Sequence, residues 1–335
     1  MDQKKIAKLA GVSTATVSRV VNNYAGVSEK TKKKVMKVIR ENMYVHNMSA
    51  RNLRSANSKT IGFLISNFSN PFFIVIYEGL EAVCRSRGYS ILIGNTNEDV
   101  EQERKAIDHL LSHRVDGIVA SFVNPSQYTL DRLNSLNTKV LMLDRKIDGL
   151  DTDTITIDNI GGAQTQVSYL MELGHRDIAV IHGSTNNSPG EERLKGYYLG
   201  MEAGGAKVNP GYVIDGDFTE ERAYNATIQL MSLSPRPTAV AVHNNLMCMG
   251  AYKALIDLNI KIPQDVSLIG FDDFDLASYL PPGITLISRP IKEMGILAAE
   301  TLLDRIESKG AEELKKVEFP SKLKVRGSCA GVSVV

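Results

Sequence analysis

The chain has 335 residues, of which 43% are hydrophobic and 23% charged, and this length and composition favour a globular protein of two or three domains. No apolar run reaches the ~18 residues of a membrane helix, and the opening "MDQKKIAKLA" lacks the apolar stretch of a signal peptide, so we expect a cytoplasmic protein that is neither exported nor membrane-bound. The net charge of +1 is unevenly distributed, since residues 1–60 hold 13 Lys and Arg against three Asp and Glu and the rest of the chain is acidic. A basic head on an acidic body is a pattern typical of nucleic-acid binding.

The sequence of the basic head, "KKIAKLAGVSTATVSRVVNN", predicts two short helices joined by a tight turn. Gly11 stands where a helix can end in the left-handed conformation at little cost, and Ser13 can cap the helix that follows. The alternative is a basic helix face that contacts only water. The apolar positions recur at helical spacing and would form a small core: Ile6, Ala7, Ala10, Val17, Val20 and Val21.

A third helix is predicted to begin at the cap residue Ser28 and to carry a run of lysines, 32–34, on its outer side. These lysines suit a phosphate backbone or simply water. Three short helices around a small apolar centre predict an all-α helix-turn-helix headpiece that binds double-stranded DNA. The third helix is expected to direct four apolar side chains inward: Val35, Val38, Ile39 and Met43.

Consecutive stretches of the head resemble the lactose-repressor (LacI/GalR) family of bacterial transcription regulators. "LAGVSTATVSRVVNN" and "VSEKTKKKVMKVI" resemble the family's headpiece, and "YVHNMSARNLRSANSKTIGFLI" resembles its hinge and the entry into its effector domain. The resemblance then continues to the C-terminus. Two features depart from the family pattern. The first helix opens on Asp2-Gln3-Lys4-Lys5, where Asp2 can still cap, and His46 replaces a usual proline, which leaves the start of the hinge less restricted.

The resemblance implies a helix-turn-helix headpiece over residues 1–46, a hinge over 47–58 and an effector-binding and dimerisation domain over 59–335. It implies that Arg19 reads a guanine in the major groove and that Leu53 enters the minor groove as a wedge. The alternative for Leu53 is a linker residue that packs on the headpiece. The DNA-binding residues implied are Ser13, Thr14, Ala15, Thr16, Ser18, Arg19, Asn22, Ser28, Asn47, Ala50 and Leu53.

From Lys59 onward, short apolar runs alternate with helical stretches, a pattern that predicts βαβ units and parallel sheets. Ten such runs suit two doubly wound halves better than one sheet. The resemblance implies the family's α/β two-lobed, periplasmic-binding-protein-like body, with an N-lobe of about 59–158 and 290–319 and a C-lobe of about 161–287 and 322–335. The predicted strands are "TIGFLI", "YSILIGN", "DGIVASF", "KVLMLD", "TITID", "DIAVIHG", "YVIDGDF", "TAVAVH", "VSLIGFDD" and "TLIS", and "VEFPSKLKVRGS" would add strands to both lobes.

The residues that follow the predicted strands form a set suited to binding a sugar. Ligands bind beyond the carboxyl ends of parallel strands, where planar Asp, Asn and Arg side chains can hold hydroxyls and aromatic rings can cover C–H faces. The same set resembles the ligand positions of the ribose-binding branch of this superfamily. The effector-binding residues implied are Asn70, Phe72, Phe73, Asp144, Arg145, Arg193, Phe218, Asn244, Asp272 and Arg289.

Two positions of this set depart from the resemblance. Relatives often carry Gln where this chain has Arg289, and Asn where it has Ala120-Ser121. A second cleft arginine suggests an anionic effector such as a sugar acid or a sugar phosphate. The alternative is that Arg289 pairs with Asp144 or Asp273 and contacts no ligand.

No nucleophile and base stand at a recognisable spacing, so we expect no enzyme. Cys84, Cys248 and Cys329 form no CxxC pair and "GFDDFD" lacks the spacing of a calcium loop, so we expect no metal and no cofactor. We predict a repressor controlled by a sugar-type effector (a pentose, hexose, sugar acid or sugar phosphate), acting as a homodimer on a near-palindromic operator. The alternative is a cytoplasmic sugar-binding protein without specific DNA recognition, which would keep its function after removal of residues 1–58.

Overall fold

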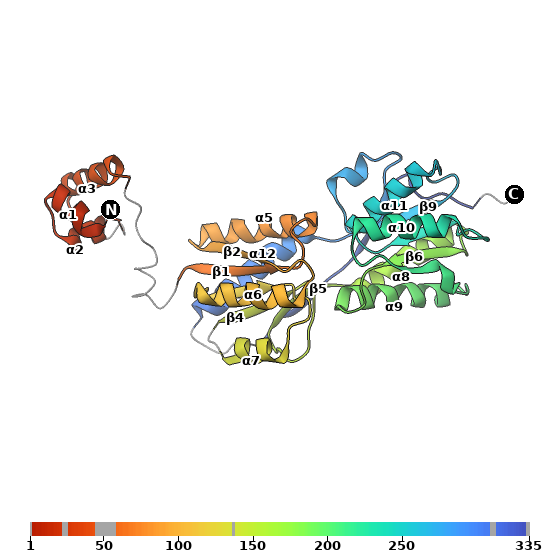
Figure 1. Cartoon of the computed structure of the whole chain (residues 1–335), viewed down its shortest axis with the longest axis horizontal. Helices are drawn as coiled ribbons and strands as arrows, with labels where there is room; N and C mark the ends of the chain where they lie inside the picture. Colours follow the sequence, from red (N-terminus) through yellow and green to blue (C-terminus); the bar gives the residue numbers. More distant parts are fainter. Residues whose placement is uncertain (1, 22–25, 44–57, 136–137, 309–312, 333–335) are drawn as a thin grey trace. The chain divides into compact units, whose positions relative to one another are not determined.

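The computed structural model describes residues 2–21, 26–43, 58–135, 138–308 and 313–332. The chain divides into two compact units, 1–58 and 59–335 (Figure 1). Within these described residues, no helix combines the length and the apolar character needed to cross a membrane.

The described residues of the small unit form three helices, α1 (Gln3–Ala10), α2 (Thr14–Val21) and α3 (Glu29–Glu41). The Asp2 side chain caps α1 by accepting a hydrogen bond from the backbone N–H of Lys5. Gly11 ends α1 with a φ of +57°, as its position in the sequence predicts. The predicted core is confirmed, with these side chains buried together: Ile6, Ala7, Ala10, Val17, Val20 and Val35.

The prediction for Met43 is wrong. Its side chain is 89% exposed, whereas Val38 and Ile39 pack against the core as expected. The helix α3 ends at Glu41, and the side-chain amide of Asn42 donates to the carbonyl of Val38. Met43 then takes a φ of +46°, so the helical spacing from Ile39 no longer applies to it.

The large unit contains two lobes, each built on one six-stranded sheet, which confirms the predicted two-sheet fold. The N-lobe sheet has the strand order β11-β5-β4-β3-β1-β2, and all of its pairings are parallel. Its elements are β1 (Thr60–Ile65), β2 (Ser90–Asn95), β3 (Gly117–Ala120), β4 (Lys139–Leu143), β5 (Asp153–Ile157) and β11 (Lys316–Phe319), with α5 (Pro71–Ser86), α6 (Val100–Ser112), α7 (Gln127–Ser135) and α12 (Ile291–Glu307).

The C-lobe sheet has the order β12-β10-β9-β8-β6-β7, and among its described strands only the edge strand β12 runs antiparallel. Its elements are β6 (Ile178–His182), β7 (Val213–Asp215), β8 (Ala239–Val242), β9 (Ser267–Phe271), β10 (Thr285–Ser288) and β12 (Lys322–Lys324), with α8 (Asn159–Glu172), α9 (Ser188–Ala203), α10 (Glu220–Met231) and α11 (Asn245–Asp257) and two short 3₁₀ turns, η1 (Pro210–Tyr212) and η2 (Asp275–Ser278).

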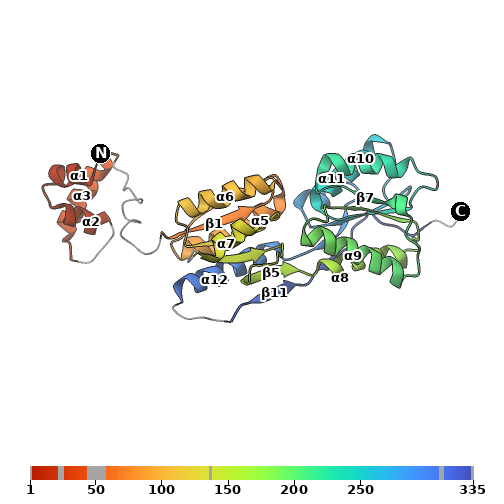
Figure 2. The same cartoon turned by 60° about the horizontal axis from the view of Figure 1, so that its bottom comes forward.

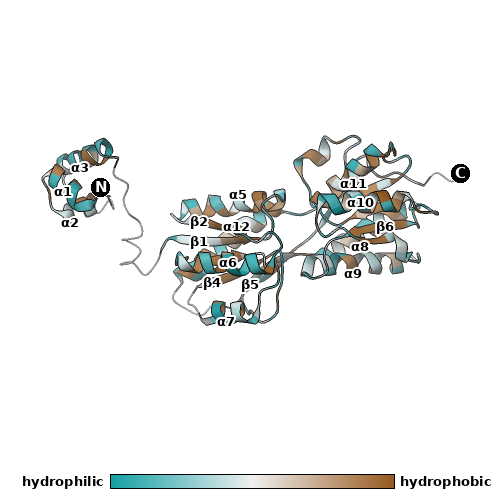
Figure 3. Cartoon of the chain, in the orientation of Figure 1, coloured by the Kyte–Doolittle hydropathy of each residue, from teal (hydrophilic) through white to brown (hydrophobic). Residues whose placement is uncertain are grey.

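Each sheet is buried on both faces, which is why its strands read as continuous apolar runs. In the N-lobe, α5 and α12 cover one face and α6 and α7 the other. In the C-lobe, α10 and α11 cover one face and α8 and α9 the other. Figure 3 shows the hydrophobic residues concentrated on strands such as β4 and β6.

Over its described residues, the large unit passes between the lobes three times, after β5, after β10 and after β11 (Figures 1 and 2). The segment that follows α12 therefore supplies an edge strand to each lobe, β11 to the N-lobe and β12 to the C-lobe, as predicted. As a result, every connection between the lobes borders the space at the carboxyl ends of the strands.

Two glycines allow α5 and α12 to approach each other closely. A Cβ on Gly79 would lie 2.3 Å from the carbonyl oxygen of Lys292, and a Cβ on Gly295 would lie 2.2 Å from that of Ile76. These partner atoms are backbone atoms, so only a shift of a whole helix can relieve such a contact.

We expect Gly295→Ala to lower the free energy of unfolding by about 1–3 kcal/mol, because the added methyl group forces the two helices apart. Urea unfolding followed by circular dichroism measures this change. Gly331→Ala is the matched control, since its Cβ would meet its nearest neighbour, the Leu173 carbonyl oxygen, at an ordinary 3.6 Å. Equal stability of the two variants would contradict the packing argument.

Candidate functional site

The first candidate site is the outer face of α2 in the small unit. Thr14, Ala15 and Arg19 are exposed on this face, because Val17 and Val20 turn the opposite side of the helix into the core. The Ser13 hydroxyl accepts a hydrogen bond from the backbone N–H of Thr16 and so starts the helix. The face therefore offers a small apolar group, hydroxyls and one long cation on a rigid helix.

The remaining DNA-binding candidates of the small unit are distributed differently. The Thr16 hydroxyl lies 2.9 Å from that of Ser13, and Ser18 is half-buried. Ser28 caps α3 by accepting from the backbone N–H of Thr31. Four of the candidates lie outside the described residues: Asn22, Asn47, Ala50 and Leu53.

The second candidate site is a cavity of about 30 Å³ between the two lobes of the body. All ten predicted effector-binding residues line it, together with five that the sequence analysis missed, Ser66, Asn67, Glu98, Pro189 and Leu246. They meet there because the carboxyl ends of both parallel sheets face the crossings between the lobes. The space holds about two water molecules, so a sugar can enter only when the lobes move apart or a side chain yields.

Arg289 joins carboxylates of both lobes in this cavity. Its Nη1 donates to Asp144 of the N-lobe at 2.8 Å, and its Nε lies 2.7 Å from Oδ1 of Asp272 of the C-lobe. The second contact is an ion pair whose angle falls outside that of a hydrogen bond. The guanidinium carbon lies 3.8 Å from the centre of the Phe72 ring, so the cation is also stacked. Of the two pairings considered from sequence, that with Asp144 is present, whereas Asp273 pairs with Lys324 and Arg326.

Asp144 and Asp272 hold equivalent positions in the two lobes. Each follows its strand with a φ of +70°, a left-handed conformation that costs free energy for a residue other than glycine. Each also donates its backbone N–H at 2.9 Å to the neighbouring strand, to Ile155 in one lobe and Ile287 in the other. This strained backbone directs both carboxylates toward the same cation.

Arg193 on α9 is fully buried beneath the cavity. Its Nε donates to Asn159 at 2.8 Å, its Nη1 donates to the carbonyl of His243, and the same nitrogen lies 3.5 Å from Asp272. Its guanidinium also stacks on Phe271 at 3.9 Å. Burial lowers the pKa of Arg193 and the Asp272 carboxylate opposes that shift. Burial, with Arg193 nearby, places the pKa of His243 well below its usual value, so that imidazole is neutral.

Arg145 forms the third ion pair of the cavity. It donates through two nitrogens to the two oxygens of Glu98, at 2.6 and 2.8 Å, and to the carbonyl of Phe122 at 3.2 Å. Glu98 follows β2, an edge strand whose carboxyl end the sequence analysis did not consider. The rule that places ligand groups after parallel strands would have found it.

The predicted asparagines cap the two helices that begin at the cavity. Asn70 begins α5 by accepting from the backbone N–H of Phe72, and Asn244 begins α11 by accepting from that of Met247. Asn245 donates to Asn70 at 3.0 Å and so ties the lobes together beside the cavity. The caps occupy the amide oxygens, so each capping amide can offer its N–H groups to a ligand.

The three aromatic residues of the set lie in different surroundings. Phe72 stacks on Arg289, and its ring meets that of Phe73 edge-on with centroids 5.0 Å apart. Phe218 lies against Gly183, where an added Cβ would come within 2.1 Å of the ring. Rings from both lobes thus border the cavity, Phe73 from one side and Phe218 from the other.

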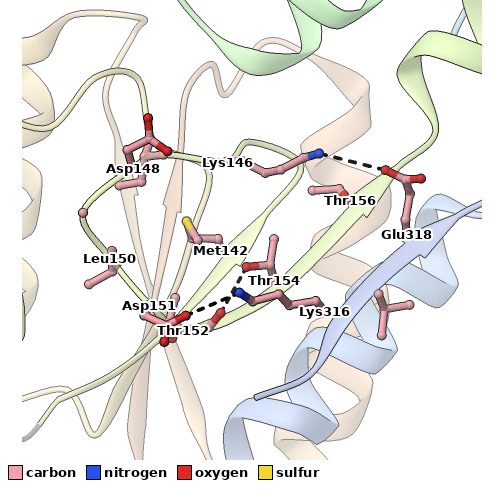
Figure 4. A pocket seen from close by; sticks show the side chains of 13 residues that line it. Met142, Lys146, Asp148, Leu150, Asp151, Thr152, Thr154, Thr156, Lys316 and Glu318 are labelled. Carbon is pink, nitrogen blue, oxygen red and sulfur yellow. Dashed lines mark hydrogen bonds and ion pairs between the residues drawn. The ribbon is translucent and has the colours of Figure 1, made fainter. Parts of the chain in front are cut away.

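A separate groove of about 600 Å³ lies on the N-lobe beside β4, β5 and β11 (Figure 4). Its rim charges pair with one another, Lys316 with Asp151 at 3.4 Å and Lys146 with Glu318 at 4.0 Å. Lys146 also reaches Glu192 of the C-lobe at 3.0 Å. We place the candidate ligand site in the cavity between the lobes because buried polar groups of both lobes converge there.

Comparisons with known proteins agree with this two-part organisation. Residues 4–47 match the family model described as bacterial regulatory proteins of the lacI family, and residues 167–329 match that of a periplasmic binding protein-like domain. The chain is 36% identical over 328 residues to the ribose operon repressor of Escherichia coli (strain K12), an alignment that covers 97% of this chain and 98% of that protein.

Two solved structures are similar along most of the chain. The lac repressor dimer bound to operator and the anti-inducer ONPF has a TM-score of 0.84 at 26% identity and covers 98% of this chain and 99% of its own. A LacI-family transcriptional regulator from Enterococcus faecium with bound ribose has a TM-score of 0.73 at 25% identity and covers 82% of this chain and 100% of its own.

Proposed function

This chain belongs to the lacI family of bacterial regulatory proteins, and we propose that it is a repressor whose affinity for operator DNA is set by a small sugar-type effector. The observation that carries the proposal is the presence, in one chain, of a helix face suited to a DNA groove and a polar cavity between two lobes. A regulator of this kind acts where the DNA is, so we place the protein in the cytoplasm. We propose no catalytic activity for it.

In this proposal α2 enters the major groove as the recognition helix. Arg19 binds a guanine through two hydrogen bonds, and Thr14 and Ala15 contact a thymine methyl or a neighbouring base edge. A homodimer presents two such helices to a near-palindromic operator. The Leu53 side chain of each hinge enters the minor groove between them.

The effector binds in the cavity between the lobes. Carboxylates, amides and guanidinium groups from both lobes hold its hydroxyls, while Phe73 and Phe218 cover its C–H faces. A hydroxyl that found no partner there would be costly to desolvate, which supplies specificity among sugars. Because the ligand contacts both lobes, its binding changes how they sit together, and a coupling of about 1–3 kcal/mol alters operator affinity about 5–150-fold.

We expect the full-length protein to protect a near-palindromic DNA site in footprinting at low salt, where attraction to phosphate is strongest. Addition of a pentose or hexose that binds the body should change the protein concentration needed for protection. A chain lacking residues 1–58 serves as the control and should bind the sugar but protect no site. Protection of no discrete site by the full-length protein would overturn the proposal and favour a plain sugar-binding protein.

A further inference from the structure

The charges around the cavity between the lobes are balanced. Among the residues that the structure describes, its lining holds three cations and three carboxylates, and each cation has an anionic partner within the cavity. Arg289 pairs with Asp144 and Asp272, and Arg193 also approaches Asp272. The remaining pair is Arg145 with Glu98. His243 lies beneath these groups in its neutral form and adds no charge.

An anionic ligand would disturb this balance. A phosphate or carboxylate bound in the closed cavity adds negative charge that none of these three cations is left to compensate. It would either remain unpaired or displace Asp144 from Arg289, and the displaced carboxylate would then be buried without its cation. A neutral hydroxyl avoids both costs, because it can donate to a carboxylate that keeps its arginine.

Resting on the function proposed above, we infer that this cavity accepts an electrically neutral polyol, such as an unmodified aldose, and rejects its phosphorylated or carboxylated counterparts. Asp144 and Asp272, whose carboxylates neutralise Arg289, determine this specificity. The second arginine suggests an anion site when only its charge is considered, but the structure uses that charge to neutralise two carboxylates brought together from opposite lobes.

Arg289 also affects the packing of the two lobes, because it contacts a carboxylate of each. Asp144 and Asp272 both follow their strands in a strained left-handed conformation, and their carboxylates contact the same guanidinium from opposite lobes. Without a cation between them the two like charges would repel. Arg289 belongs to the segment that crosses between the lobes after β10. Its cation is therefore held between the two carboxylates by the chain itself and offsets their repulsion.

Calorimetric titration of the full-length chain with matched ligand pairs tests the inference. D-ribose is paired with D-ribose 5-phosphate, and D-glucose is paired once with D-glucose 6-phosphate and once with D-gluconate. We expect the neutral member of at least one pair to bind about tenfold or more tightly than its charged counterparts. Tighter binding of the charged members would overturn the inference.

We expect two charge variants to shift the preference for neutral over anionic ligands in opposite directions. Asp144→Asn removes one carboxylate and should shift the neutral-to-anionic affinity ratio toward the anion by about tenfold or more, whereas Arg289→Gln should shift it further toward the neutral ligand. Asp151→Asn removes the same charge at an exposed rim position outside the cavity and should leave the ratio unchanged. If Asp144→Asn fails to fold, titration of the unmodified chain with the ligand pairs still tests the preference.

Footprinting of the same preparations separates this inference from the proposed function. Operator protection together with a preference for phosphorylated or acidic ligands would overturn the inference alone. Absence of a protected site would overturn the repressor proposal, whatever the ligand preference. Operator protection without binding of any of these compounds would overturn both the sugar-type effector and the inference about its charge.

Discussion

Arg193→Ala is expected to abolish the response to effector and to lower the free energy of unfolding of the body by about 3–5 kcal/mol. The substitution leaves a carboxylate and an amide, Asp272 and Asn159, without the buried guanidinium that they share. It also removes the cation that stacks on Phe271. The headpiece is a separate compact unit and should keep its fold and its affinity for operator DNA.

Urea unfolding of the body and footprinting with and without ligand measure the two effects of Arg193→Ala. Arg193→Lys tests the part played by geometry, because it keeps the charge but not the planar fork, and should lose effector affinity with a smaller loss of stability. Arg222→Ala is the control, since Arg222 is an exposed residue 3.6 Å from Asp217 and such pairs contribute little. A normal effector response in Arg193→Ala would remove this residue from the site.

Arg19→Ala is expected to weaken specific operator binding by about 2–6 kcal/mol, since a bidentate contact to guanine contributes about 1–3 kcal/mol and a dimer makes it twice. Arg19 is exposed on α2 and outside the headpiece core, so the fold should be unaffected. Binding to unrelated DNA should change much less, because phosphate contacts from the other basic residues remain.

Competitive binding of operator and random DNA at several salt concentrations measures the effect of Arg19→Ala. Lys33→Ala on the exposed side of α3 is the comparison, because a phosphate contact should weaken binding to every sequence about equally and reduce the salt dependence. Equal losses on operator and random DNA for Arg19→Ala would show that Arg19 contacts only the backbone.

Most of the fold could be predicted from the sequence because its strands are buried on both faces and therefore appear as continuous apolar runs. β1 and β10 begin and end where "TIGFLI" and "TLIS" predict. Met43 was misplaced because its spacing from Ile39 continues the helical pattern beyond the point where the backbone leaves the helix. The end of a helix depends on one or two residues, whereas a strand is specified by several.

The residues that line the cavity could be predicted from the sequence, but the ion pairs among them could not. The carboxyl ends of parallel strands meet at one edge, so a local pattern identifies the residues that gather there. Which cation faces which anion depends on contacts between residues far apart in the chain, such as Arg289 with Asp144. The charge of Arg289 alone therefore favoured an anionic ligand, whereas its neighbours in space favour a neutral one.

The three crossings between the lobes also affect how this protein is made. The N-lobe sheet begins at Thr60 but lacks its edge strand until Phe319 has been added, about 260 residues later. At about 5–20 residues per second, a ribosome needs about 13–50 s to supply that span. The headpiece can fold first, so a nascent chain carries a finished DNA-binding unit ahead of an incomplete body, and a chain that terminates early would lack parts of both lobes.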